Sequence, residues 1–161
     1  MHLLKALSFT TLAVLFSLIF IGGYVSASGV GLTCPDWPLC PQGLVPHEDF
    51  IIEYIHRSVA ATTGILVIAT MAFTLKSKDA TTGMKIASII AAGTVIGQIT
   101  LGAIVIVERL HAILVTAHLG LGLVLFSMVL MTLLYAFKID NQRIKTSAIS
   151  SNLSASKDKY Y

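Results

Sequence analysis

The chain has 161 residues, of which 55% are hydrophobic and 12% are charged, and its formal net charge at pH 7 is +3. This composition is too apolar for a soluble domain of this length and is typical of a single membrane domain. The small positive charge gives no reason to expect nucleic acid as a partner, because the placement of the basic residues relative to the membrane explains it.

Four stretches without charged residues are long enough to cross a bilayer as helices, namely 6–27, 58–75, 86–107 and 112–137. With short connections they predict an all-α, polytopic membrane protein built as a four-helix transmembrane bundle within residues 1–137. The first stretch has features of a signal peptide, but its length favours a retained helix. Residues 138–161 are rich in Ser, Lys and Asn, so we expect a polar cytoplasmic tail that is disordered from Asp140.

Basic residues are distributed unevenly between the two sides of this bundle. One side carries Lys5, Lys76, Lys78, Lys85, Lys138, Arg143, Lys145, Lys157 and Lys159, and only Arg57 and Arg109 lie near the other. The positive-inside rule then places both termini in the cytoplasm, as expected for a multi-pass protein of the cell membrane. Residues 28–50 become the one long extracytoplasmic loop.

This loop holds all four prolines and both cysteines of the chain, Cys34 and Cys40. Pro and Gly at this density predict an ordered, turn-rich loop. The extracytoplasmic side permits a disulfide, which would staple the loop over the mouth of the bundle. The alternative is a redox-active pair that exchanges electrons, although the Cys-x-x-Cys spacing of thioredoxin-type sites is absent. Trp37 is either an interface anchor or a functional residue.

Glu53, His56 and Arg57 stand at the start of the second predicted span. Intramembrane ionisable groups are costly, so they usually face the bundle interior and mark a site. Glu53 and His56 are three residues apart and share a helical face, on which Ala60 and Gly64 leave room for a flat, bulky ligand. The alternative is that Glu53 pairs with Arg57 at i,i+4 and only anchors the helix end.

His118 is the only Asp, Glu, Lys, Arg or His residue of the fourth span. It lies roughly 9–12 Å below the outer helix ends, level with His56. Two level imidazoles across an apolar bundle suit a haem iron with two histidine ligands, whereas zinc or copper would want a third ligand. Arg57 could bond haem propionates, and His111 is either a propionate partner or an interface residue. Taken alone, His118 could instead form an interhelical hydrogen bond.

Five separated motifs between residues 3 and 137 resemble the amino-terminal half of the haem A synthase family. They are Ile21-Gly22-Gly23-Tyr24-Val25 leading to Gly29-x-Gly31, Cys34 with Trp37-Pro38-x-Cys40, Glu53-Tyr54-Ile55-His56-Arg57, Gln98-x-x-Leu101-Gly102-Ala103, and Ala117-His118. Typical members have eight helices in two similar halves, each with a histidine pair, and this chain has one half. The resemblance therefore leads us to expect a homo-oligomer, with Gly93-x-x-x-Gly97 as a possible contact.

By resemblance, the chain is an oxidoreductase that converts a methyl group of haem O into a formyl group through successive hydroxylations, which gives haem A for terminal oxidases. Haem O is then the substrate and haem b the cofactor, with His56 and His118 as iron ligands. Glu53 would be the catalytic group that stabilises positive charge or accepts a proton near the reacting methyl. The bilayer is one partner, and haem O synthase or a terminal oxidase could be others. The cysteine pair is implicated in haem handling or electron flow.

Two functions without catalysis also suit a four-helix bundle with histidines. One is a b-type haem electron carrier, although carriers usually have two histidine pairs per bundle and only one level pair is present here. The other is a membrane protein that binds or delivers haem. Quinone-linked disulfide-forming enzymes share the four helices but need a second cysteine pair, which this sequence lacks.

Overall fold

The computed structural model describes residues 2–34, 37 and 48–157, apart from the side chains of 49 and 151–157. Over these ranges the chain forms helices α1 (His2–Ser28), α2 (Ile51–Lys76), α3 (Thr82–Val107) and α4 (Ala112–Lys157), with single 3₁₀ turns at η1 (Val30–Leu32) and η2 (Glu48–Phe50). No strand occurs in the described ranges. All four helices are long and apolar enough to cross a membrane. The predicted all-α, four-helix membrane fold is therefore confirmed.

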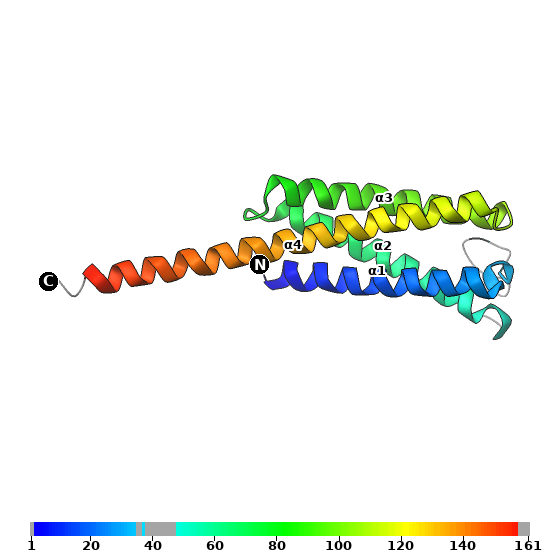
Figure 1. The fold of residues 1–161 in the computed structure, drawn as a ribbon, viewed down its shortest axis with the longest axis horizontal. Helices are drawn as coiled ribbons and strands as arrows, with labels where there is room; N and C mark the ends of the chain where they lie inside the picture. The colour runs from blue at the N-terminus through cyan, green and yellow to red at the C-terminus, as the bar shows by residue number, and fades with distance from the viewer. Residues whose placement is uncertain (1, 35–36, 38–47, 158–161) are drawn as a thin grey trace.

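The four helices form an up-and-down bundle (Figure 1). Each helix packs against two neighbours, α1 against α2 and α4, and α3 against α2 and α4. At the Glu53 end of the bundle, α1 stops, α2 starts and α3 turns into α4. At the opposite Lys5 end, α1 starts and α2 turns into α3.

The core takes apolar side chains from all four helices. Its buried members are Leu15, Val67, Ala91, Ala92, Val95, Leu125 and Val129. Many large apolar side chains instead point outward, including Phe20 at 75% exposure and Ile65 at 71%. A helix that is apolar on its outer face as well as its inner face is expected where lipid replaces water as the surrounding solvent.

The Lys5 end is closely packed and its charged groups are paired. Leu4, Met84 and Ala136 form a second buried cluster there. The ammonium group of Lys5 forms an ion pair with Asp140 and lies 5.6 Å from the ring centroid of Phe137. These contacts join the first turns of α1 to the last bundle turn of α4.

Helix α4 does not stop where the apolar stretch ends. The predicted disorder from Asp140 is wrong for residues 140–157. Helix α4 continues to Lys157, beyond the ends of the other three helices (Figure 1). Residues 141–150 are all exposed. Polarity had suggested disorder, but residues 138–157 contain no Gly or Pro, so a helix that is already nucleated in the bundle can propagate through them.

The Gly93-x-x-x-Gly97 motif of α3 is divided between two environments. A Cβ at Gly97 would lie 3.3 Å from a methyl group of Leu121 on α4, whereas a Cβ at Gly93 would meet nothing within 4 Å. Gly97 thus serves packing within the chain. Gly93 is exposed on the outer face of α3.

Candidate functional site

The two predicted histidines, His56 on α2 and His118 on α4, are both half-buried. Each imidazole lies against a glycine of a neighbouring helix. A Cβ would stand 3.0 Å from Cε1 of His56 if placed on Gly22 of α1, and 3.3 Å from Cε1 of His118 if placed on Gly102 of α3. The two glycines therefore provide the space that the two rings occupy.

One nitrogen of each ring is buried without a partner. Nδ1 of His56 and Nδ1 of His118 accept or donate no hydrogen bond within the part of the chain that the structure describes. Buried polar atoms are normally satisfied, so the unsatisfied nitrogens of these two imidazoles fit a ligand that both could bind. Among the same residues, no group of three or more His, Cys, Asp or Glu side chains is placed to hold a metal ion. The pair of imidazoles thus fits a metal group that takes two histidine ligands, such as haem iron.

Glu53 lies one turn before His56 and is only 2% exposed. Both of its carboxylate oxygens are engaged. Oε1 accepts a hydrogen bond of 2.6 Å from the guanidinium of Arg57, which confirms the predicted i,i+4 contact. Oε2 accepts bonds from the backbone N–H of Cys34 at 2.9 Å and from the hydroxyl of Thr33 at 3.2 Å. The carboxylate is thereby held in one position by three donors.

Arg57 completes a clamp on the peptide groups of Cys34. Its guanidinium donates a 2.7 Å hydrogen bond to the carbonyl oxygen of Cys34, while Glu53 binds the N–H of the same residue. The sequence pattern could indicate the Glu53–Arg57 pair but not this contact, because the contact joins residues 23 apart through the fold. The predicted bonds between Arg57 and haem propionates stay a prediction.

Cys34 is fully buried beneath this clamp, and no cysteine is free in the described part of the chain. Cys40 and His47 lie outside the described residues, so the Cys34–Cys40 disulfide stays a prediction. Trp37 is described and is 51% exposed. This exposure is compatible with either of the two roles expected for it.

A second contact fixes the chain just before Cys34. A Cβ on Gly31 would stand 3.1 Å from a methyl group of Leu110, in the turn between α3 and α4. Leu110 and Arg109 both have positive φ, 61° and 49°. His111 follows, is exposed, and its carbonyl accepts the first helical hydrogen bonds of α4, from Leu114 and Val115. His111 is therefore a surface residue of the turn.

Gln98 is a polar side chain within the membrane-spanning helix α3, where it needs a polar partner. Its Oε1 is buried and accepts no hydrogen bond from the described residues. Its Nε2 lies 2.7 Å from where a Cβ on Gly122 of α4 would stand. The side chain of Gln98 is thus packed directly over the backbone of α4, with its oxygen unsatisfied.

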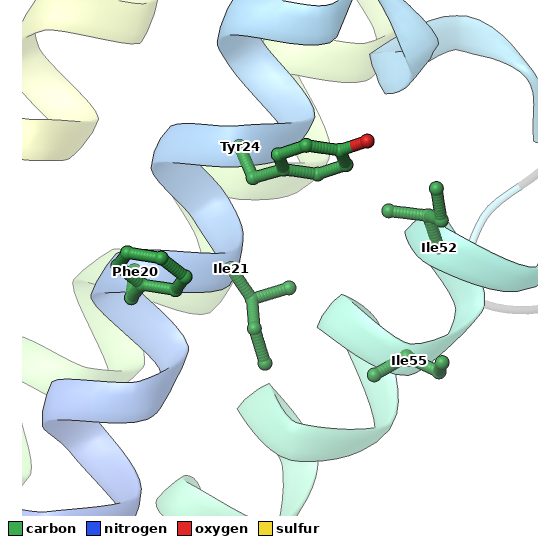
Figure 2. A pocket seen from close by; sticks show the side chains of 5 residues that line it. All are labelled: Phe20, Ile21, Tyr24, Ile52 and Ile55. Atoms are coloured by element: carbon green, nitrogen blue, oxygen red, sulfur yellow. The ribbon is translucent and has the colours of Figure 1, made fainter.

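An apolar groove opens between α1 and α2 beside the histidine site. Figure 2 shows Ile21 and Tyr24 of α1 directed toward Ile52 and Ile55 of α2, with Phe20 further around α1. The groove has a volume of about 240 Å³. Ile21 and Ile55 directly precede Gly22 and His56, so the groove follows the outer side of the contact between those two residues. Its lining is apolar apart from the Tyr24 hydroxyl, so the groove suits an apolar chain.

Comparison with known proteins points in the same direction as this geometry. Residues 47–156 match the COX15-CtaA family, described as cytochrome oxidase assembly protein. The chain is similar to a protein named Heme A synthase from Bacillus licheniformis, at 35% identity over 137 residues that cover 83% of this chain and 45% of that protein. A Heme A synthase from Geobacillus kaustophilus is 33% identical, with coverages of 83% and 43%. One from Exiguobacterium sibiricum is 28% identical, with coverages of 87% and 48%. The chain spans about half the length of these relatives.

Proposed function

The chain belongs to the COX15-CtaA family of cytochrome oxidase assembly proteins, and we propose that it is a haem A synthase, which oxidises a methyl group of haem O to a formyl group. The observation that carries this proposal is the pair of neighbouring imidazoles, each with a buried nitrogen that lacks a partner. The relatives named Heme A synthase supply the reaction. Substrate, cofactor and activity belong to the proposal, since the relatives are about twice as long as this chain.

In this proposal His56 and His118 would hold the haem iron. Gly22 and Gly102 leave room for the two imidazoles against the neighbouring helices. Haem O is the substrate, and haem b is the cofactor, whose iron supplies one-electron chemistry when bound. Arg57 is placed near the mouth of the site, where a guanidinium can bond propionates.

Glu53 is the proposed catalytic residue. Its carboxylate is desolvated, lies one turn from His56, and is held by Arg57, Thr33 and the N–H of Cys34. A negative charge that is fixed in advance stabilises positive charge at a reacting carbon without reorganisation. The oxidation takes its oxygen from water and passes electrons to an acceptor, and the same carboxylate oxygens could accept a proton that it releases. Glu53→Gln should therefore abolish turnover while haem remains bound, and unchanged turnover would exclude this role.

We propose that two or more copies of the chain associate in the membrane through α3. Gly93 is exposed on α3 with space over it, which suits close contact between helices of two copies in a membrane. Native mass spectrometry of the purified protein should then show more than one chain per detergent micelle. Full activity from a single chain per micelle would contradict the oligomer.

The function implies a setting for the chain. We place it in the cell membrane with both termini in the cytoplasm and the cysteine loop outside, on the strength of its basic residues. Haem O synthase and a terminal oxidase handle the substrate and the product, and are the partners that this reaction suggests. A Cys34–Cys40 disulfide would either hold the loop or exchange electrons. A normal yield of haem A from Cys34→Ala would mean that the disulfide has only a structural role.

The deciding experiment is expression of the full chain in cells that make haem O but no haem A, followed by extraction and chromatography of the haems. We expect haem A with the wild-type chain and none with His118→Ala. A chain that purifies with bound haem but yields no haem A would instead be an electron carrier or a haem-delivery protein, and would overturn the proposal.

A further inference from the structure

Gln98 lies at the same contact between α3 and α4 as His118, one helical turn away. Gln98 and Gly102 are four residues apart on α3, and His118 and Gly122 are four residues apart on α4. Gly102 faces His118, and Gly122 faces Gln98. Because the helices are antiparallel, Gln98 lies about 6 Å further toward the Lys5 end than the His118 contact. It therefore stands at the inner boundary of the histidine site.

The side-chain amide of Gln98 has one atom without a hydrogen-bond partner among the described residues. Its oxygen is buried and unsatisfied with respect to every described residue, while its nitrogen packs over Gly122. A buried carbonyl oxygen without a donor is unfavourable, and in a membrane the surrounding lipid offers no hydrogen bond. The glycine at 122 leaves room for this side chain, and any Cβ there would displace it. The packing at Gly122 therefore holds the Gln98 oxygen in place as a hydrogen-bond acceptor.

We propose that the carbonyl oxygen of Gln98 accepts a hydrogen bond from an O–H group of the ligand that His56 and His118 bind. This inference rests on the proposed function. Haem O carries a hydroxyl group on its isoprenoid side chain, whereas haem b has a vinyl group at that position and no such donor. Gln98 would then add a contact that only haem O makes, to a site that haem b could also occupy without it. An ordered water molecule beside the ring offers the same O–H chemistry.

The test is titration of the purified full chain in detergent with haem O and, separately, with haem b, followed by absorbance. Gln98→Leu keeps the approximate size of the side chain but removes the acceptor, and we expect haem O to bind about tenfold more weakly. Gly122→Ala should weaken haem O in the same direction, since its Cβ would stand 2.7 Å from Nε2. Gly120→Ala is the matched control, because a Cβ there meets nothing within 4 Å.

The two haems distinguish the two sources of the donor. A loss confined to haem O assigns the bond to the substrate hydroxyl, and an equal loss for both haems assigns it to bound water. Unchanged or tighter binding of both haems by Gln98→Leu overturns the inference while the proposed function stands. A wild-type chain that binds neither haem removes the proposed function and this inference together. If Gln98→Leu does not fold, as judged by its helical circular dichroism, the outcome with Gly122→Ala decides.

Discussion

The two ends of the bundle are built from the same kinds of helix but treat polar groups differently. At the Lys5 end, Lys5 is paired with Asp140, and Leu4, Met84 and Ala136 are packed together. At the Glu53 end, charges are buried inside a clamp, and imidazole nitrogens are left without partners. One end is closed by packing, and the other holds the groups that a ligand could use.

Unpartnered atoms alone do not make this difference. Ser8 and Thr74, toward the Lys5 end, also have buried hydroxyls without a hydrogen bond in the described ranges. Both residues are 0% exposed, however, whereas His56 and His118 are only half-buried. The two imidazole rings are thus partly open at their surface although their Nδ1 atoms are buried, whereas Ser8 and Thr74 are wholly enclosed. The comparison therefore predicts that substitutions at the Glu53 end change binding and that substitutions at the Lys5 end change stability.

The largest expected effect is loss of haem binding when a ligand imidazole is removed. His56→Ala and His118→Ala should each abolish the absorption spectrum of an iron with two histidine ligands, because no third His, Cys, Asp or Glu joins them in the part of the chain that the structure describes. His111→Ala is the control, since His111 is exposed in the turn and should leave the spectrum unchanged. An intact spectrum in either ligand variant would contradict the site.

Removal of Arg57 should have the largest effect on stability. Arg57→Ala would leave Glu53 buried and without its ion-pair partner, which costs about 3 kcal/mol of unfolding free energy. The measurement is unfolding in detergent followed by circular dichroism. The matched control is Arg143→Ala, which breaks the exposed Arg143–Asp79 pair, whose side chains are 66% and 48% exposed, and should cost at most about 0.5 kcal/mol. Equal effects of the two variants would mean that the clamp on Cys34 adds no stability.

A glycine substitution at the Lys5 end should reduce stability without affecting haem. A Cβ on Gly83 would stand 2.9 Å from the hydroxyl oxygen of Tyr135. Gly83→Ala therefore forces Tyr135 aside in a packed region, and overpacking of this kind costs about 1–2 kcal/mol. Unfolding measurements should show this loss, while haem affinity remains that of the wild type. A change in the haem spectrum would remove the distinction between the two ends.

The same substitution at the Glu53 end should have the opposite profile. Gly22→Ala places a Cβ 3.0 Å from Cε1 of His56, so the ring must move away from its position. We expect haem affinity to fall about tenfold, a change of roughly 1.4 kcal/mol in binding free energy. Gly23→Ala is the control, because its Cβ meets nothing within 4 Å. Equal affinities for the two variants would show that the position of the ring against α1 is unimportant.

Much of the fold could be predicted from sequence alone. The uncharged stretches located the four helices, since an 18-residue apolar run has few alternatives to a membrane helix. The expectation that His56 and His118 lie at the same depth came from counting helical rise. The extension of α4 could not be predicted from its polar composition, because a long helix propagates from a nucleus that lies outside the segment itself.

The details of the site required the structure. The pairing of Gly22 with His56 and of Gly102 with His118 depends on the rotation of each helix about its axis, which spacing along one helix does not determine. The grip of Glu53 and Arg57 on the peptide groups of Cys34 depends on the path of a loop. Local periodicity contains information about a single element, and these contacts join different elements.

The short turn between α3 and α4 has a consequence for how this family member could vary. Arg109 and Leu110 hold left-handed backbone conformations that cost about 1–2 kcal/mol each for residues with a Cβ. This strained turn sets the phase of α4 relative to α3, and with it both the Gly102–His118 and the Gln98–Gly122 contacts. One inserted residue would rotate the following helix by about 100° and misalign both contacts at once. Insertions in other surface loops are usually harmless, but the length of this turn determines which side chains meet between α3 and α4.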